Sequence, residues 1–188
     1  GLSCGKPEEK LGIRSSDTCE LYFDQVRVPK KNLVGNLGTG FKIALGTLDG
    51  GRIGIASQAL GIAQASLEHS VSYSKERKQF GKPISKNQII QFKLADMAME
   101  IQAARMLIFK AAWEKDNKIN FSSSASMAKV YASEVAMRAS TQCVQIHGGY
   151  GYIKETGVER LMRDAKITQI YEGTSEIQRI VIARDLLK

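Results

Sequence analysis

The stretch that decides the fold runs from Ser124 to Ile146 and reads SASMAKVYASEVAMRASTQCVQI. Apolar or small side chains recur in it at steps of three and four residues, which is the spacing of one face of an α-helix. The residues on this face are Ala128, Ala132, Val135, Ala139, Cys143 and Ile146. Because small side chains dominate the face, the stretch predicts a long helix that neighbouring helices approach closely.

Similar helical patterns occupy most of the chain on both sides of this stretch. The expected helices span about 41–48, 53–77, 85–115, 124–146, 158–166 and 175–187. Three of them are long and joined by short turns, which is typical of an up-and-down four-helix bundle. We therefore predict a mainly α fold, with the bundle formed by residues 33–188. Because the long helices are apolar on more than one face, oligomerisation through the bundle is also expected.

Two local signals predict where these helices begin or bend. Asp49-Gly50-Gly51-Arg52 is expected to interrupt or kink the chain between the first short helix and the first long one. Ser85 and Gln88 have the Ser-x-x-Gln spacing of a capping box, so the second long helix is expected to open there.

Residues 1–32 have a different character from the rest of the chain. Leu21, Phe23, Val26 and Val28 come close to period-two alternation, and Pro29 closes the run. One or two strands cannot form a stable sheet alone. The segment is therefore expected to be the end of a β domain whose beginning is absent, and the start at Gly1 is interpreted as that of a piece of a longer protein or of a processed form.

Composition excludes several classes of function. The longest apolar run is far shorter than the roughly 20 residues that cross a membrane, so no membrane partner is expected. No metal site is expected, because the two histidines and the cysteines Cys4, Cys19 and Cys143 form no ligand cluster. The three widely spaced cysteines also form no disulfide framework, so a reducing compartment is expected. The net charge of +8 fits either a nucleic acid or a polyanionic small ligand such as a nucleotide or coenzyme A. The basic residues are spread along the chain, which favours the small ligand over nucleic acid.

The candidate catalytic residue lies in the stretch from Ile170 to Arg179, which reads IYEGTSEIQR. Ser175 and Gln178 again have capping-box spacing, so Thr174 or Ser175 is expected to cap a helix that begins here. Glu172 then lies on a turn beside the bare backbone of Gly173, which is a suitable place for a general base. The alternative is a solvated glutamate in a loop before the last helix.

Three further groups have both a structural and a functional interpretation. Arg77 either balances a helix dipole or binds phosphate, and Gln88 lies eleven residues beyond it. The run from Gln145 to Gly151 either stops a helix or offers backbone N–H groups to an anion. Asp49 and Arg52 form either an ordinary ion pair or a polar pair at the mouth of a ligand channel.

Taken together and in order, these motifs resemble the C-terminal half of the acyl-CoA dehydrogenases. The resemblance covers essentially all of the chain and is strongest, from Leu48 to Glu68 and from Ile90 to Met97, to the short-chain (butyryl-CoA) branch. The motifs that carry it are Lys10–Arg14, Val26–Pro29, Asp49-x-x-Arg52 followed by IGIA, Arg77-x-x-Phe80-Gly81, Gln145–Gly151, Arg163–Lys166 and Ile170–Arg179. By this resemblance residues 1–32 are the end of the family's middle β domain.

The resemblance implies FAD as the cofactor, shared between subunits of a homotetramer that is a dimer of dimers. Arg77, Phe80 and Gln88 would contact the FAD of a neighbouring subunit. The adenosine end would meet Gln145, Ile146, Gly148 and Gly149. Thr174, Ser175 and Glu176 would contact the FAD in the chain's own site. The acyl-CoA substrate would lie against Asp49, Arg52 and Gly173.

By the same resemblance Glu172 is the catalytic base of an acyl-CoA dehydrogenase. It would remove the pro-R α-proton of a short-chain acyl-CoA while the β-hydride passes to the flavin, giving the trans-2-enoyl-CoA. The backbone N–H of Glu172 would donate to the thioester carbonyl. Some branches carry the base at the position of Gly51, which here has no carboxylate. His147 stands where a larger aliphatic residue is common.

The resemblance also implies partners and places the reaction in fatty-acid or amino-acid catabolism. An electron-transferring flavoprotein would accept the electrons, and the compartment would be the bacterial cytoplasm or the mitochondrial matrix. Two alternatives belong to the same family at large: an oxidase-like member that reacts with oxygen, and a flavin-binding relative that binds DNA.

Overall fold

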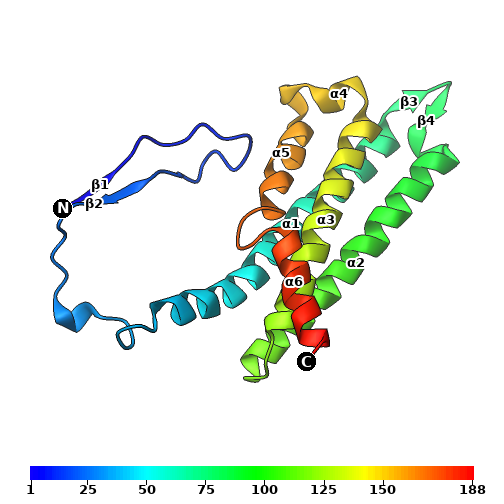
Figure 1. The fold of residues 1–188 in the computed structure, drawn as a ribbon. Helices are drawn as coiled ribbons and strands as arrows, with labels where there is room; N and C mark the ends of the chain where they lie inside the picture. Colours follow the sequence, from blue (N-terminus) through cyan, green and yellow to red (C-terminus); the bar gives the residue numbers. More distant parts are fainter.

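The small-residue face lies on helix α3 (Ser122–His147), which packs against α1 (Gly40–Glu76) and α2 (Gln88–Asp116), as Figure 1 shows. All six side chains of the small-residue face are buried. Helices α5 (Val158–Thr168) and α6 (Ser175–Leu186) follow one another along α3 and together take the fourth position of the bundle. The computed structural model describes residues 1–188, and in it the predicted four-helix bundle is confirmed.

Short elements, which the sequence patterns did not predict, connect the long helices. A small hairpin of β3 (Lys78–Gln79) and β4 (Lys82–Pro83) leads from α1 into a 3-10 turn at Ile84–Lys86 and then into α2. Helix α3 stops at Gly148, whose φ of +61° suits glycine. A single-turn helix, α4 (Gly149–Tyr152), and a 3-10 turn at Lys154–Thr156 then lead into α5.

The predicted kink at Asp49-Gly50-Gly51-Arg52 was wrong, because α1 runs through it as one helix of 37 residues. Each glycine costs roughly 1 kcal/mol of helix propensity relative to alanine. Tertiary packing outweighs this cost, since Arg52 and Ala56 are buried directly after the glycines. Arg52 is also paired with Asp49 one turn earlier, at 2.6 Å between Nη1 and Oδ1. The short helix and the long helix of the prediction are therefore one element.

Both predicted capping boxes differ from the structure. Ser85 lies in the 3-10 turn, and α2 begins only at Gln88, after Asn87, whose side chain makes no capping hydrogen bond. At α6 the cap is Thr174, whose Oγ1 accepts from the backbone N–H of Ile177 at 3.4 Å. Thr174 was one of two expected caps, but Gln178 does not complete a box. The Gln178 side chain instead donates to the carbonyl oxygens of Glu172 and Gly173, in the turn before α6.

The N-terminal arm is a two-stranded antiparallel hairpin of β1 (Leu2–Cys4) and β2 (Leu21–Phe23), with Leu2 opposite Phe23. Its loop reaches α5 through two hydrogen bonds. The backbone N–H of Ile13 donates to Asp164 Oδ1 at 2.7 Å, and Arg163 Nη1 donates to the carbonyl of Leu11 at 2.8 Å. Two motifs that are 151–152 residues apart in sequence therefore meet. The division into residues 1–32 and 33–188 stays a prediction.

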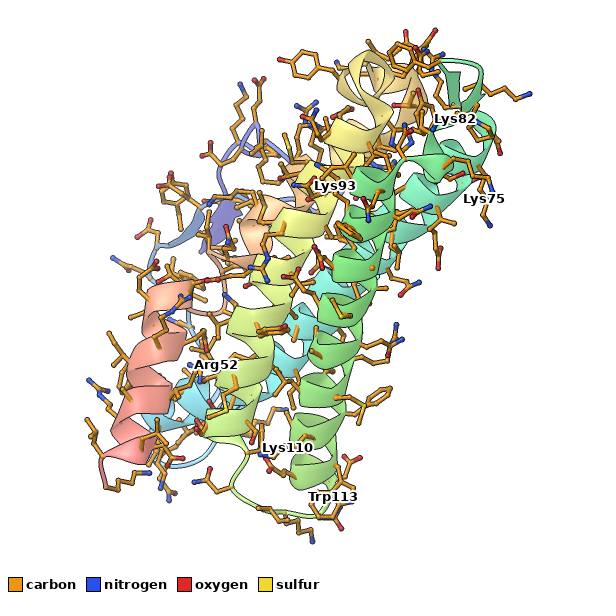
Figure 2. The ribbon with its side chains drawn as sticks, turned by 90° about the vertical axis from the view of Figure 1, so that its right-hand side faces the viewer. Arg52, Lys75, Lys82, Lys93, Lys110 and Trp113 are labelled. Carbon is orange, nitrogen blue, oxygen red and sulfur yellow. The ribbon has the colours of Figure 1, made fainter.

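The outer face of α2 carries large apolar side chains in contact with solvent. Four of them repeat at intervals of seven residues and form the outer stripe of α2: Phe92, Met99, Met106 and Trp113. Figure 2 shows Trp113 at the end of α2, with basic side chains such as Lys93 and Lys110 spread along the bundle rather than gathered in one block. None of the helices combines the length and the apolar character that crossing a membrane requires.

Candidate active site

The turn that carries Glu172 connects α5 to α6 and has an unusual backbone. Glu172 has a φ of +54° and Gly173 a φ of +87°, so both residues lie in the left-handed region. A residue with a side chain rarely adopts this conformation unless its surroundings impose it. Tyr171, just before the turn, donates its hydroxyl hydrogen to Gln58 Oε1 on α1. The turn is therefore fixed against the bundle and is not a freely solvated loop.

The carboxylate of Glu172 lies directly against the backbone of α1 at Gly51. A Cβ placed on Gly51 would come within 2.7 Å of Glu172 Oε2 and 2.9 Å of its Cδ. The glycine that seemed to break α1 is thus the position where only a hydrogen leaves room for the carboxylate. Gly51 and Glu172 were both singled out from the sequence, and the structure brings them together.

One oxygen of this carboxylate has no partner within the protein. Glu172 Oε2 is buried and accepts no hydrogen bond, and no lysine, arginine or histidine nitrogen lies within 4.0 Å of the carboxylate. Buried carboxylate oxygens are normally hydrogen-bonded or paired with a cation. The backbone N–H of Glu172 also donates no hydrogen bond. A free acceptor and a free donor therefore lie on the same residue.

The carbonyl groups of the turn, in contrast, are held by two buried side chains. Gln178 Nε2 donates to the carbonyl oxygens of Glu172 at 3.0 Å and of Gly173 at 2.8 Å. Lys129 Nζ, which extends from α3, donates to the carbonyl oxygen of Gly173 at 2.8 Å. Both side chains are completely buried. A Cβ on Gly173 would meet Gln178 Nε2 at 2.8 Å, so glycine is required there for space as well as for its φ.

Asp49 and Arg52 flank Gly51 on α1 and form the expected ion pair. Arg52 is buried, and its Nη1 donates to Asp49 Oδ1 at 2.6 Å and to Ser126 Oγ on α3 at 3.3 Å. Asp49 also accepts from Ser122 Oγ at 3.0 Å. Arg52 pairs with Asp49 and forms no ion pair with Glu172. Arg52 Nε is buried without a partner, so this pair keeps one donor unused.

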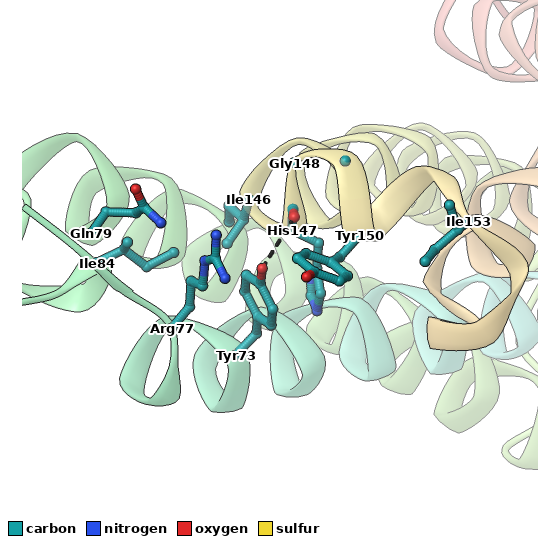
Figure 3. Close-up of a pocket in the computed structure, with 10 residues that line it drawn as sticks. Tyr73, Arg77, Gln79, Ile84, Ile146, His147, Gly148, Tyr150 and Ile153 are labelled. Carbon is teal, nitrogen blue, oxygen red and sulfur yellow. Dashed lines mark hydrogen bonds between the residues drawn. The ribbon is translucent and has the colours of Figure 1, made fainter.

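A hollow lies at the far end of the bundle, where α3 ends at α4, and Figure 3 shows its lining. It has a volume of about 540 Å³ and includes four of the predicted cofactor residues, Arg77, Ile146, Gly148 and Gly149. The guanidinium carbon of Arg77 lies 5.4 Å from the centre of the Tyr150 ring. A cation, an aromatic ring and bare backbone therefore border one open space.

His147 forms part of the floor of this hollow and is held by several contacts. Its ring stacks on Tyr73 with centroids 4.1 Å apart, and its Nδ1 lies 2.8 Å from the carbonyl oxygen of Cys143. A carbonyl can only accept, so Nδ1 carries a hydrogen. Burial lowers the pKa of His147 below its ordinary value, with the Cys143 hydrogen bond opposing and His69 adding to the shift. His147 therefore favours the neutral form and stacks on Tyr73 as part of the wall of this hollow.

The remaining predicted cofactor residues lie outside this hollow. Phe80, Gln88 and Gln145 are exposed near the same end of the bundle, and Phe80 is 97 % exposed. Thr174, Ser175 and Glu176 form the start of α6, next to Glu172 and away from α4 (Figure 1). Within one chain, the predicted cofactor residues therefore form two separate groups.

The sequence patterns missed Lys129 and Gln178. A signal for Lys129 was present, because it follows Ala125 by four residues and precedes Ala132 by three, which places a lysine in phase with a buried face. Gln178 gave no separate signal, since it was assigned to a capping box.

Comparisons with known proteins identify the family. The family model for the C-terminal domain of acyl-CoA dehydrogenase matches residues 38–187. The mitochondrial short-chain specific acyl-CoA dehydrogenase of Mus musculus is 59 % identical over 188 residues, which is 100 % of this chain and 46 % of that protein. The chain thus spans about half the length of the curated relatives it matches.

Solved structures of acyl-CoA dehydrogenases also match the whole chain. Butyryl-CoA dehydrogenase from Megasphaera elsdenii superposes with a TM-score of 0.99 at 58 % identity, over 100 % of this chain and 49 % of that one. A chain in a structure of the electron transferring flavoprotein of Acidaminococcus fermentans also has a TM-score of 0.99, at 56 % identity over 100 % and 50 %. The chain therefore belongs to the acyl-CoA dehydrogenase family, and residues 38–187 match its C-terminal domain.

Proposed function

We propose that the protein catalyses the flavin-dependent α,β-dehydrogenation of a short-chain acyl-CoA to the trans-2-enoyl-CoA. The observation that carries this proposal is the buried, unpartnered Oε2 of Glu172 against the bare backbone of Gly51. The identity to short-chain and butyryl-CoA enzymes supports the substrate class.

Glu172 has the properties that a base for α-proton removal needs. Its Oε2 lone pairs are not committed to any donor, so they are free to accept a proton. Its unused backbone N–H can donate to the thioester carbonyl oxygen, where negative charge develops as the α-proton leaves. Gly173 leaves bare backbone next to this point. Asp49 and Arg52 then border the substrate as a neutral pair that leaves the carboxylate free.

The two groups of predicted cofactor residues fit FAD. At the hollow near α4, Arg77 offers a cation for phosphate, and Cβ atoms on Gly148 and Gly149 would meet nothing within 4 Å, so the backbone is open. Ile146 lines the same space, with Phe80, Gln88 and Gln145 beside it. Near Glu172, Thr174, Ser175 and Glu176 lie at a helix N-terminus, and Ser175 Oγ is buried without a partner. FAD, when bound, supplies the two-electron oxidation.

An oligomer explains why these groups are separate in one chain. If two subunits share each flavin, the hollow near α4 serves the flavin of a neighbour and the start of α6 serves the chain's own. The outer stripe of α2 offers the apolar surface for such an assembly, and we propose a homotetramer. The match to a chain in an electron transferring flavoprotein structure supports such a flavoprotein as the electron acceptor. One relative is named as mitochondrial and another comes from a bacterium, and we propose the mitochondrial matrix or the bacterial cytoplasm as the location.

Glu172→Gln in the flavin-loaded, full-length protein tests the proposed base. Glutamine keeps the shape of the side chain but cannot accept the α-proton, so turnover of butyryl-CoA is expected to fall by at least about 1,000-fold. Flavin content, read from the visible spectrum, is expected to stay unchanged. Glu155→Gln, at an exposed site, is the control. Turnover of the Glu172→Gln variant at the control's rate would refute the assignment.

Gly51→Ala separates the needs of the site from the needs of the helix. Alanine improves helix propensity by roughly 1 kcal/mol, which offsets part of the cost of the clash with Glu172, so the variant is expected to stay folded. The added Cβ would press on Glu172 Oε2, so kcat is expected to fall by about 10- to 100-fold. Gly61→Ala on the same helix adds a Cβ into open space and is expected to raise stability without loss of kcat. Equal kcat in the two variants would contradict the contact.

Arg77→Met tests the hollow near α4 as a flavin site. Loss of a charge-assisted contact to phosphate is expected to weaken FAD binding by about 10- to 100-fold. The dissociation constant is measured by titrating apoprotein with FAD and following flavin fluorescence. Arg184→Met, at an exposed position on α6, is the control. If both variants bind FAD like the unaltered protein, Arg77 has no part in the cofactor site.

A further inference from the structure

Lys129 is a buried cation that has no role in the reaction proposed above. Its side chain extends from α3 with no exposed surface, and no carboxylate oxygen lies within 4.0 Å of its ammonium. Its hydrogen bond goes to the carbonyl oxygen of Gly173, 44 residues away, at 2.8 Å. Burying a lysine without an ion pair is costly, and such lysines are rare in folded proteins. Its only side-chain hydrogen bond is to the Glu172–Gly173 turn, so that turn is where its function is to be sought.

The backbone of that turn determines where the Glu172 carboxylate lies. Both turn residues have positive φ, which Glu172 adopts only under constraint. Two side chains supply the constraint: Gln178 holds both carbonyl oxygens from α6, and Lys129 holds the second carbonyl from α3. Lys129 therefore links the turn to α3, whereas Gln178 links it to α6, the helix that follows the turn. Relaxing φ of Glu172 would swing its carboxylate away from Gly51.

We propose that Lys129 is a positioning residue, which fixes the left-handed Glu172–Gly173 turn through the Gly173 carbonyl and so places the Glu172 carboxylate for proton removal. This inference rests on the proposed function of Glu172. Lys129 itself acts through the turn, since its hydrogen bond is to the backbone and not to the carboxylate.

The charges around Lys129 predict a pH dependence. The ionisable groups that face it are Arg52 from α1, Glu172 from the turn and Glu176 from α6. Burial, and then Arg52, lower the pKa of Lys129 to about 8, and Glu176 and Glu172 oppose this shift. The ammonium is therefore charged at neutral pH and is lost as the pH rises above about 8. A neutral amine still donates to a carbonyl, but more weakly.

Loss of this proton is not expected to destabilise the folded protein. Because burial lowers the pKa, the neutral form of Lys129 is favoured in the folded state relative to the unfolded chain. The contribution of Lys129 to the free energy of unfolding therefore does not decrease as the pH passes about 8. A fall in kcat over this range, with flavin content unchanged, thus reports the turn and not denaturation.

Lys129→Met in the flavin-loaded, full-length protein is the test. Methionine fills the space of the apolar part of the lysine side chain and leaves no buried charge, and the Gly173 carbonyl keeps its hydrogen bond from Gln178. We expect kcat for butyryl-CoA to fall by about 100-fold, since a misplacement of about 1 Å has an effect of this order. KM and flavin content are expected to change by less than about threefold. Lys188→Met, at an exposed lysine, is the control and is expected to match the unaltered protein.

The pH profile completes the test. In the unaltered protein kcat is expected to fall several-fold as the pH rises through about 8, and in Lys129→Met this descending limb is expected to be absent. Unaltered kcat and an unchanged profile in Lys129→Met would overturn the inference. If Lys129→Met does not fold, the pH profile of the unaltered protein is the test. A kcat that stays constant as the pH rises through about 8 would also overturn the inference. Retained turnover in Glu172→Gln would instead refute the proposed function itself.

Discussion

The contact between the Glu172 carboxylate and the backbone of Gly51 is the constraint on which the rest of the site depends. It requires that α1 carries no side chain at this point, and so a glycine stands inside a long helix at a cost in helix propensity. It also requires a left-handed turn at Glu172, which Gln178 and Lys129 hold from two different helices. The bundle thus supplies rigid elements that place one side chain.

Charge is arranged so that this carboxylate stays free. Two buried cations, Arg52 and Lys129, lie in the same region, yet neither forms an ion pair with Glu172. Arg52 is neutralised by Asp49, and Lys129 is engaged by a backbone carbonyl. A direct ion pair would have stabilised the charged carboxylate and made it a weaker base. The unpartnered Oε2 is therefore a consequence of where the cations are directed.

The sequence predicted the parts of this structure that depend on helical periodicity. The small-residue face of α3, the long helices and the turn at Glu172 followed from local spacing, because burial of one face repeats with the helix. The kink at Gly50-Gly51 was wrongly predicted, since propensity is a local quantity and the packing of Arg52 and Ala56 is not. Lys129 was missed; its spacing from Ala125 and Ala132 could have marked it as buried, but its partner is 44 residues away, so local spacing could not show what it holds.

The most direct test of the account is hydrogen exchange at the α-carbon of a substrate analogue. Methylthioacetyl-CoA has the length of butyryl-CoA and keeps its α-hydrogens, but a sulfur atom replaces the β-carbon, so no hydride can leave. With the flavin-loaded protein in D2O, mass spectrometry is expected to show deuterium entering the α-position. With Glu172→Gln the exchange rate is expected to fall by at least about 1,000-fold. Exchange at an undiminished rate in that variant would contradict the role of Glu172 as the base.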